Sequence, residues 1–485
     1  MTPFRFGPPG LLLIVLAVAT CGAMAAPPNV LLIVADDMNT DLGAYGHPRV
    51  ETPNIDRLAR NGVLFERAYA QYPQCNQSRS SFLTGRYPDQ TRALTLKEHF
   101  REALPDVVTL PQHFRNHGYF TARVGKIYHQ GVPDGIGADG LDDPPSWDLV
   151  LNPAGVDIRV DERIVTIVPP EHDRRRFGGT LSWLSLAGDE AHTDELVAAE
   201  AVHFLERHRS QRTGQPFFLA LGFYRPHTPF VAPRRWFDRY PPETLDLAAV
   251  PPGDRENKPV AALADRPWQA EMSDVQKRSA IQGYYASISF VDEQIGKVLD
   301  ALAAAGLAQD TLVVFTSDHG YQLGSHGLWQ KRDLYENSVR TPLVIAAPGR
   351  LESGTVTDTL VELVDLYPTL VSLAGLEAPA SRLEGRDLRA ILDGAAPPRD
   401  TALSQAWSAA GWVRPEFRGA DIMGYTIRTD RYRYTEWGGG ADGVELYDYR
   451  EDPLEYRNLA ADPKAAEIQS LLKARLQARL EAIRP

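Results

Sequence analysis

The segment Asn29-Val30-Leu31-Leu32-Ile33-Val34-Ala35 runs directly into a pair of acids, Asp36-Asp37. Its continuous apolar, β-branched character predicts a strand buried on both faces, as at the centre of a parallel sheet. Open α/β sheets form their binding sites at the carboxyl ends of the strands, so the two acids are candidate site residues. Adjacent carboxylates repel each other, and we therefore expect a cation between them. The alternative is a solvated loop that carries two acids by chance.

The same pattern recurs along the chain. Residues 119–124, 216–222 and 311–316 also read as buried strands. The polar residues that follow them are Lys126 and His129, then His227, then Asp318 and His319, with Lys331 on a glycine-rich loop beyond. Each of these alone is more often a surface or structural residue. Together, at the site-bearing edge of one sheet, they predict a single charged cluster.

The three carboxylates of Asp36, Asp37 and Asp318 require a divalent cation if their strands are neighbours. Oxygen ligands favour a hard ion such as Ca²⁺ or Mg²⁺. His319 suits Ca²⁺ less well, so chemistry alone leaves Zn²⁺ or Mn²⁺ open.

The fold class predicted from these runs is α/β, with a large, mostly parallel sheet flanked by helices. Helices are expected near residues 52–59, 193–208, 274–306 and 363–374. Beyond residue 378, polar and apolar residues alternate at 425–429 and 432–437, and a last helix is expected over 464–483. We therefore predict a main domain over 26–378 and a smaller α+β C-terminal subdomain, with an antiparallel sheet, over 379–485.

Residues 1–25 have the pattern of a secretory signal peptide. Arg5 supplies the positive charge, Leu11 to Ala19 the apolar segment, and Ala23-Met24-Ala25 a cleavage site. The sequence thus predicts an exported protein, periplasmic or secreted, without a stable membrane span once the signal is removed. An uncleaved membrane anchor is the alternative. Cys21 would leave with the signal, so we expect Cys75 to have no partner for an internal disulfide.

The net charge of the 485-residue chain is −12, which argues against non-specific binding of nucleic acid. An acidic protein can still bind an anionic substrate, but only in a local basic pocket.

Cys75 opens the run Cys75-Asn76-Gln77-Ser78-Arg79, which continues to Thr84-Gly85-Arg86. A cysteine at the start of a helix faces amide donors and a favourable dipole, which suits an anion such as sulfate. A buried, inert thiol is the alternative interpretation. The run resembles the signature of the formylglycine-dependent sulfatases, and segments such as Thr316 to Gly320 extend the resemblance over nearly the whole mature chain. Residue 77 is Gln where that family prefers Pro or Ala.

The resemblance implies an alkaline-phosphatase-like fold and a set of roles. A maturation partner, the formylglycine-generating enzyme, would oxidise Cys75 to formylglycine. The calcium ligands implied are Asp36, Asp37, Asp318 and His319, with the formylglycine at Cys75. The sulfate-binding and acid–base residues implied are Arg79, Lys126, His129, His227 and Lys331, and His227 is the expected proton donor to the leaving alcohol.

The function implied is that of a sulfuric ester hydrolase acting on a sulfated saccharide. Similarity to the iduronate-2-sulfatase branch suggests a 2-O-sulfated uronic acid, while choline sulfate or an algal polysaccharide remain alternatives. A phosphate or phosphonate ester hydrolase on the same fold is another. A non-catalytic protein that binds sulfated glycans is the alternative if Gln77 prevents conversion of Cys75.

Overall fold

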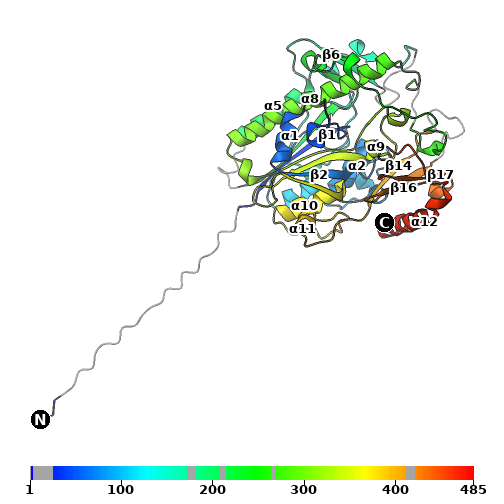
Figure 1. Ribbon diagram of the computed structural model, residues 1–485. Helices are drawn as coiled ribbons and strands as arrows, with labels where there is room; N and C mark the ends of the chain where they lie inside the picture. Colours follow the sequence, from blue (N-terminus) through cyan, green and yellow to red (C-terminus); the bar gives the residue numbers. More distant parts are fainter. Residues whose placement is uncertain are drawn as a thin grey trace.

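A computed structural model describes residues 2–3, 26–171, 181–207, 215–264, 268–410 and 421–484. Its centre is a twisted sheet of eight strands (Figure 1). In spatial order these are β13 (Thr355–Glu362), β2 (Val63–Tyr69), β12 (Arg340–Ala346), β9 (Thr311–Ser317), β1 (Asn29–Asp36), β7 (Phe217–Pro226), β3 (Phe120–Gly125) and β4 (Leu149–Leu151).

Strand β1 lies in the middle of this sheet, as its apolar sequence predicts. It pairs in parallel with both neighbours, so that Val30 lies opposite Leu312 of β9 and Phe218 of β7. Strand β12 is antiparallel to β9 and to β2. The predicted α/β class with a mostly parallel sheet is therefore confirmed.

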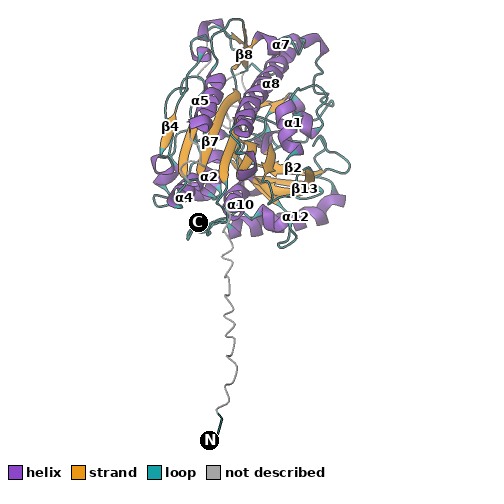
Figure 2. Ribbon diagram, turned by 90° about the vertical axis from the view of Figure 1, so that its left-hand side faces the viewer, coloured by secondary structure: helices purple, strands orange, loops and turns teal. Residues whose placement is uncertain are grey.

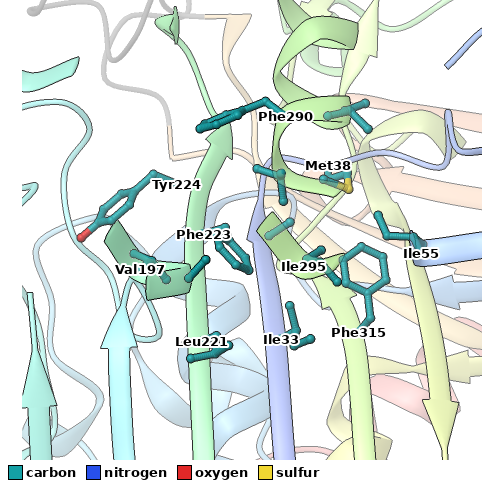
Figure 3. Close-up of a cluster of buried hydrophobic side chains, with 14 of the residues drawn as sticks. Ile33, Met38, Ile55, Val197, Leu221, Phe223, Tyr224, Phe290, Ile295 and Phe315 are labelled. Carbon is teal, nitrogen blue, oxygen red and sulfur yellow. The ribbon is translucent and has the colours of Figure 1, made fainter. Parts of the chain in front are cut away.

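Two layers of helices cover the sheet (Figure 2). Helices α1 (Pro53–Arg60), α5 (Thr193–Arg207) and α8 (Asp274–Ala304) share one hydrophobic cluster with Leu31 and Ile33 of β1. Helices α2 (Cys75–Thr84), α4 (Leu110–Asn116) and α10 (Leu366–Leu373) share the other with Leu32 and Val34. Figure 3 shows the first face, where Ile33 lies beside Ile295 of α8. The alternation of side chains along β1 thus fills both cores.

The C-terminal region forms the expected antiparallel sheet and last helix. Its strands are β14 (Ala402–Trp407), β15 (Met423–Arg428), β16 (Tyr432–Trp437) and β17 (Gly443–Asp448), followed by α12 (Ala466–Ala482). Trp437 and Tyr447 share a hydrophobic cluster with Tyr69 of β2 and with Tyr335. Strand β14 and the outer strands β2 and β13 were not predicted. The boundary between residues 378 and 379 remains a prediction.

The remaining elements are short. They are α3 (Pro88–Thr91), β5 (Val165–Thr166), β6 (Ser182–Leu186), β8 (Phe230–Pro233), α7 (Arg234–Phe237), β10 (Gln322–Leu323), β11 (Trp329–Gln330), α9 (Glu336–Val339) and α11 (Leu388–Leu392). Across the described ranges, we find no helix with the length and apolarity that crossing a bilayer requires. The predicted signal peptide, apart from residues 2 and 3, lies outside the described residues.

Candidate active site

The carboxyl ends of β1, β3, β7 and β9 meet at one edge of the sheet and place the predicted residues there. Two glycines allow this close approach. A Cβ on Gly222 of β7 would lie 1.9 Å from the carbonyl oxygen of Lys126, and one on Gly125 would lie 2.3 Å from that of Gly222. Because no side chain separates these two backbones, the segment after β3 packs directly against β7 and reaches the end of β1. Lys126 Nζ then donates to Asp36 Oδ2 at 2.6 Å, with both side chains fully buried.

Helix α2 supplies a guanidinium that joins three of these strand ends. Arg79 is fully buried, and its Nε donates to Asp318 Oδ2 at 2.9 Å. Its Nη2 donates to Asp36 Oδ1 at 3.0 Å. Its Nη1 donates to the carbonyl oxygens of Lys126 and Ile127. Arg79 therefore fixes the positions of two carboxylates that arise far apart in the sequence.

Cys75, the first residue of α2, lies against this group. Its Sγ is 3.5 Å from His319 Nε2 and 3.6 Å from Asp37 Oδ1. Lys331 Nζ lies 3.3 Å from the same sulfur and also donates to Asp37 Oδ1. Burial, reinforced by the charge of Asp36, raises the pKa of the Cys75 thiol well above its ordinary value. An unmodified Cys75 is therefore a neutral thiol and a poor nucleophile.

Asp37 carries a carboxylate oxygen that is not hydrogen-bonded. Its backbone is left-handed, with φ of 67°, and its N–H donates to Asp318 Oδ1 at 3.0 Å. Its buried Oδ2 has no hydrogen-bond partner among the described residues. Burial opposes ionisation, but His227 and Lys331 outweigh it and lower the pKa of Asp37 to about 2. An ionised, buried oxygen without a donor is costly unless a cation binds it.

The surrounding donors fit a divalent cation. Ligand atoms of Asp37, Cys75, Asp318 and His319 all lie within 4.8 Å of one another, as do those of Asp36, Asp37, Cys75 and His227. His319 directs Nδ1 to the carbonyl oxygen of Gly320 at 2.9 Å, which leaves Nε2 facing the group. Carboxylate oxygens dominate this set, as hard cations prefer.

The two other histidines lie at the border of the cluster. His227 Nε2 is 3.8 Å from Asp37 Oδ2, and its Nδ1 faces the carbonyl oxygen of Thr228 at 2.5 Å. Burial lowers the pKa of His227 to about 4, although Asp37 partly offsets it. His129 is half-buried, and burial together with Lys126 holds its pKa well below the ordinary value. Both rings are therefore neutral near pH 7 in the free protein.

All ten predicted site residues thus gather at this edge, and the sequence reasoning missed two others beside them. Ser317 Oγ accepts the N–H of Met38 at 2.8 Å and donates to the carbonyl oxygen of His319 at 2.9 Å. Arg332 follows Lys331 and donates to Gln74, the residue before Cys75. Adjacency to predicted site residues was the signal that could have found both.

Comparison with known proteins identifies the class of protein to which this edge of buried charges, with a cysteine at the start of α2, belongs. Residues 28–376 match the sulfatase family, and residues 324–482 match the family described as N-sulphoglucosamine sulphohydrolase, C-terminal. The chain belongs to the sulfatase family and is a sulfuric ester hydrolase.

Its relatives include two iduronate 2-sulfatases. The one from Mus musculus is 34% identical, with 90% of this chain and 91% of the relative covered. The one from Homo sapiens is 32% identical, with coverage of 92% and 93%. Among solved structures, a phosphonate monoester hydrolase of Agrobacterium radiobacter superimposes with a TM-score of 0.76 at 25% identity, over 94% of this chain and 96% of that one.

Proposed function

We propose that the protein removes sulfate from a saccharide bearing a 2-O-sulfated uronic acid, using residue 75 after its oxidation to formylglycine and a bound divalent cation. The observation that carries the proposal is the position of Cys75 Sγ, which is within 3.6 Å of Asp37, His319 and Lys331 side-chain atoms. The similarity to iduronate 2-sulfatases supports the choice of sugar.

Asp36, Asp37, Asp318 and His319 would hold the cation, with residue 75 beside it. We propose Ca²⁺, because carboxylate oxygens make up most of the set. When bound, the cation supplies positive charge that attracts a sulfate oxygen and lowers the pKa of a neighbouring hydroxyl group. Hydrated formylglycine supplies that hydroxyl group, which a thiol with a raised pKa cannot replace.

The chain's own side chains would bind the sulfate group and manage its protons. Lys331 Nζ contacts Cys75 Sγ, the atom at the nucleophile position, and Lys126 Nζ donates to Asp36. Both ammonium groups would therefore face an oxygen of a bound sulfate. Arg79 is hydrogen-bonded on every side by the acids and by backbone carbonyls, so we assign it to positioning those acids. His129 lies at the rim with a free Nδ1 among the described residues.

His227 would protonate the leaving alcohol. In the free protein it is neutral, because burial holds its pKa at about 4. A bound sulfate ester brings a negative charge beside the ring, which favours the protonated form and makes the proton available for the leaving oxygen.

Two measurements test the proposal. Mass spectrometry of the peptide containing residue 75, after co-expression with a formylglycine-generating enzyme, should find the aldehyde. The converted protein should then release sulfate from a disaccharide ending in a 2-O-sulfated uronic acid faster than from its 6-O-sulfated counterpart. Unchanged cysteine after such co-expression would contradict the proposed nucleophile and favour a protein that only binds sulfated glycans.

A phosphonate or phosphate ester is the second candidate substrate, because a phosphonate monoester hydrolase is among the similar structures. Turnover of matched aryl sulfate and aryl phosphate esters decides between them. A higher kcat/KM for the phosphate ester would overturn the proposed substrate class while leaving the nucleophile in place.

A further inference from the structure

His227, the proposed proton donor, lies in the short loop that joins β7 to β8. Its Nδ1 faces the carbonyl oxygen of Thr228 at 2.5 Å, and its Nε2 lies 3.8 Å from Asp37 Oδ2. Proton transfer requires the ring nitrogen to lie within hydrogen-bond distance of the leaving oxygen. The groups that fix the backbone of this loop therefore decide where the His227 ring can deliver a proton.

One guanidinium holds both sides of this loop. The Arg225 side chain is fully buried, and its Nη1 donates to the carbonyl oxygen of His227 itself at 3.2 Å. Its Nε donates to the carbonyl oxygen of Val231, in β8, at 3.0 Å. Because a guanidinium is planar and its donors have fixed directions, these two bonds set the two carbonyl groups relative to each other.

Asp157 occupies the remaining side of the same guanidinium. Arg225 Nη2 donates to Asp157 Oδ2 at 2.7 Å, and both side chains are buried. Asp157 Oδ1 accepts from the N–H and the hydroxyl group of Thr193, at 2.8 and 2.7 Å. Burial opposes ionisation of Asp157, but Arg225 and Thr193 outweigh it and lower the pKa of that carboxyl group. The pair is therefore charged, and Thr193 connects it to the start of α5.

Asp194, the second residue of α5, fixes the end of β7 just before the loop. Its Oδ1 accepts the N–H of Tyr224, and its Oδ2 accepts the N–H of Arg225, each at 2.9 Å. The start of α5 thus holds the backbone of Arg225 through Asp194 and its side chain through Asp157.

We propose that Arg225, held by Asp157, is a positioning residue that directs the His227 ring toward the leaving oxygen of the ester. The inference rests on the proposed function, since it concerns the proton that His227 would supply. A buried ion pair by itself adds little stability, because desolvation offsets its attraction. A fixed geometry is its use here, because a displacement of about 1 Å can lower the rate about 100-fold.

The test compares two aryl sulfates of similar size, phenyl sulfate and para-nitrophenyl sulfate, at equal formylglycine content and per folded molecule. Nitrophenolate is a stable anion that leaves without a proton, whereas the less acidic phenol needs one. His227→Gln should lower kcat/KM on phenyl sulfate by about 100-fold or more, and several-fold less on the nitrophenyl ester. Arg225→Gln should show the same selectivity, with a loss of about 10- to 100-fold on phenyl sulfate.

Further variants separate positioning from general damage. Arg225→Lys should keep part of the rate, because the charge facing Asp157 remains while the planar set of donors is lost. Adding Arg225→Gln to His227→Gln should lower the rate little further, because the group to be positioned is already gone. If Arg225→Gln does not fold, Asp157→Asn combined with Arg225→Gln leaves no buried charge unpaired and should show the same selectivity.

Arg433→Gln is the matched control. Arg433 is also a fully buried arginine, and its ion-pair partners among the described residues are Glu336 and Glu455. Its removal should change the rates on the two esters by the same factor. Equal losses on the two esters in Arg225→Gln, beside a selective loss in His227→Gln, would overturn the positioning role and leave the proposed function standing. Equal losses in His227→Gln would instead contradict the proposed proton donor.

NMR of isotopically labelled histidine rings gives a readout that needs no turnover. The His227 signal is identified by its absence in His227→Gln. Arg225→Gln should move or broaden this signal, and Arg433→Gln should leave it unchanged. An unchanged His227 signal in Arg225→Gln overturns the proposal, whether or not the two aryl sulfates are hydrolysed.

Discussion

The buried ionic cluster around Asp37 and the one around Glu336 differ in how their carboxylates are satisfied. In the Glu336 cluster, which comprises Glu336, Arg428, Arg433 and Glu455, Arg433 bridges the two glutamates at 2.5 Å each. Hydroxyl groups of Tyr69 and Tyr449 donate to the two oxygens of Glu336 at 3.0 Å. The cluster joins β2, α9 and β16.

The Asp37 cluster also matches acids with cations, because Asp36, Asp37 and Asp318 face Arg79, Lys126 and Lys331. Yet Asp37 Oδ2 accepts no hydrogen bond among the described residues, whereas both oxygens of Glu336 do accept one. Asp37 is also held in a left-handed backbone conformation. Buried charge alone therefore does not mark a site. A buried, ionised oxygen that accepts no hydrogen bond does indicate a binding site, because only a ligand can satisfy it.

Cys75→Ser is the substitution with the largest expected effect. It removes the thiol that we propose as the precursor of formylglycine, and turnover of a sulfate ester should fall by about 10⁴-fold or more, as when other enzymes lose their nucleophile. Glu336→Gln, measured per folded molecule, should retain turnover, because the contacts that Glu336 makes with described residues do not include residue 75. Comparable losses of turnover in the two variants would contradict the assignment of catalysis to the Asp37 cluster and of stability to the Glu336 cluster.

The sequence predicted the central strands of the sheet, and the polar residues at their ends, better than the outer strands. The runs of β1, β7, β9 and β3 are mostly apolar because these strands are almost fully buried, and the polar residues at their ends indicate the site. Strand β2 carries Glu66 and Arg67 in its exposed middle, and β13 has alternating exposure, so neither has the pattern of a central strand. The left-handed backbone of Gln330 and Arg332, on either side of Lys331, was not predicted, because no local sequence pattern encodes it.

Glu336→Gln should instead destabilise the fold, in a way that depends on pH. Burial opposes ionisation of Glu336, but Arg428 and Arg433 outweigh it and lower its pKa from 4.5 to about 2. A depressed carboxylate pKa contributes stability above the unfolded-state pKa, here about 3 kcal/mol, and loses it as pH falls from about 4.5 to about 2. In denaturant unfolding, the variant should therefore have a lower free energy of unfolding than wild type at pH 7, and the two values should converge near pH 2. A difference that stays constant with pH would exclude this assignment.

Calcium should stabilise the protein through the Asp37 cluster and not through the Glu336 cluster. At a calcium concentration about 100 times the Kd, binding adds about 2.7 kcal/mol to the free energy of unfolding. Thermal unfolding of chelator-treated protein should shift upward when Ca²⁺ is restored. Glu336→Gln should keep the shift, and Asp37→Asn should lose it because a charged ligand is gone. An equal shift in Asp37→Asn would place the ion elsewhere.

Gln77→Pro should have the smallest effect on stability. It also distinguishes a role of residue 77 in the conversion of Cys75 from a role in the mature protein. Residue 77 is the third of α2, in the first turn, where proline disrupts no intrahelical hydrogen bond. The substitution removes the side-chain bonds to Gln74 and to the carbonyl oxygen of Leu94, and we expect a loss of about 2 kcal/mol in the free energy of unfolding. Conversion of Cys75, measured by mass spectrometry, should rise because the signature then has the residue that the family prefers. Gln77→Ala restores the other preferred residue and is the control for backbone rigidity. If conversion is already complete with Gln77 and unchanged in both variants, then residue 77 does not limit maturation, and its buried bonds to Gln74 and Leu94 are the reason that remains for glutamine at this position.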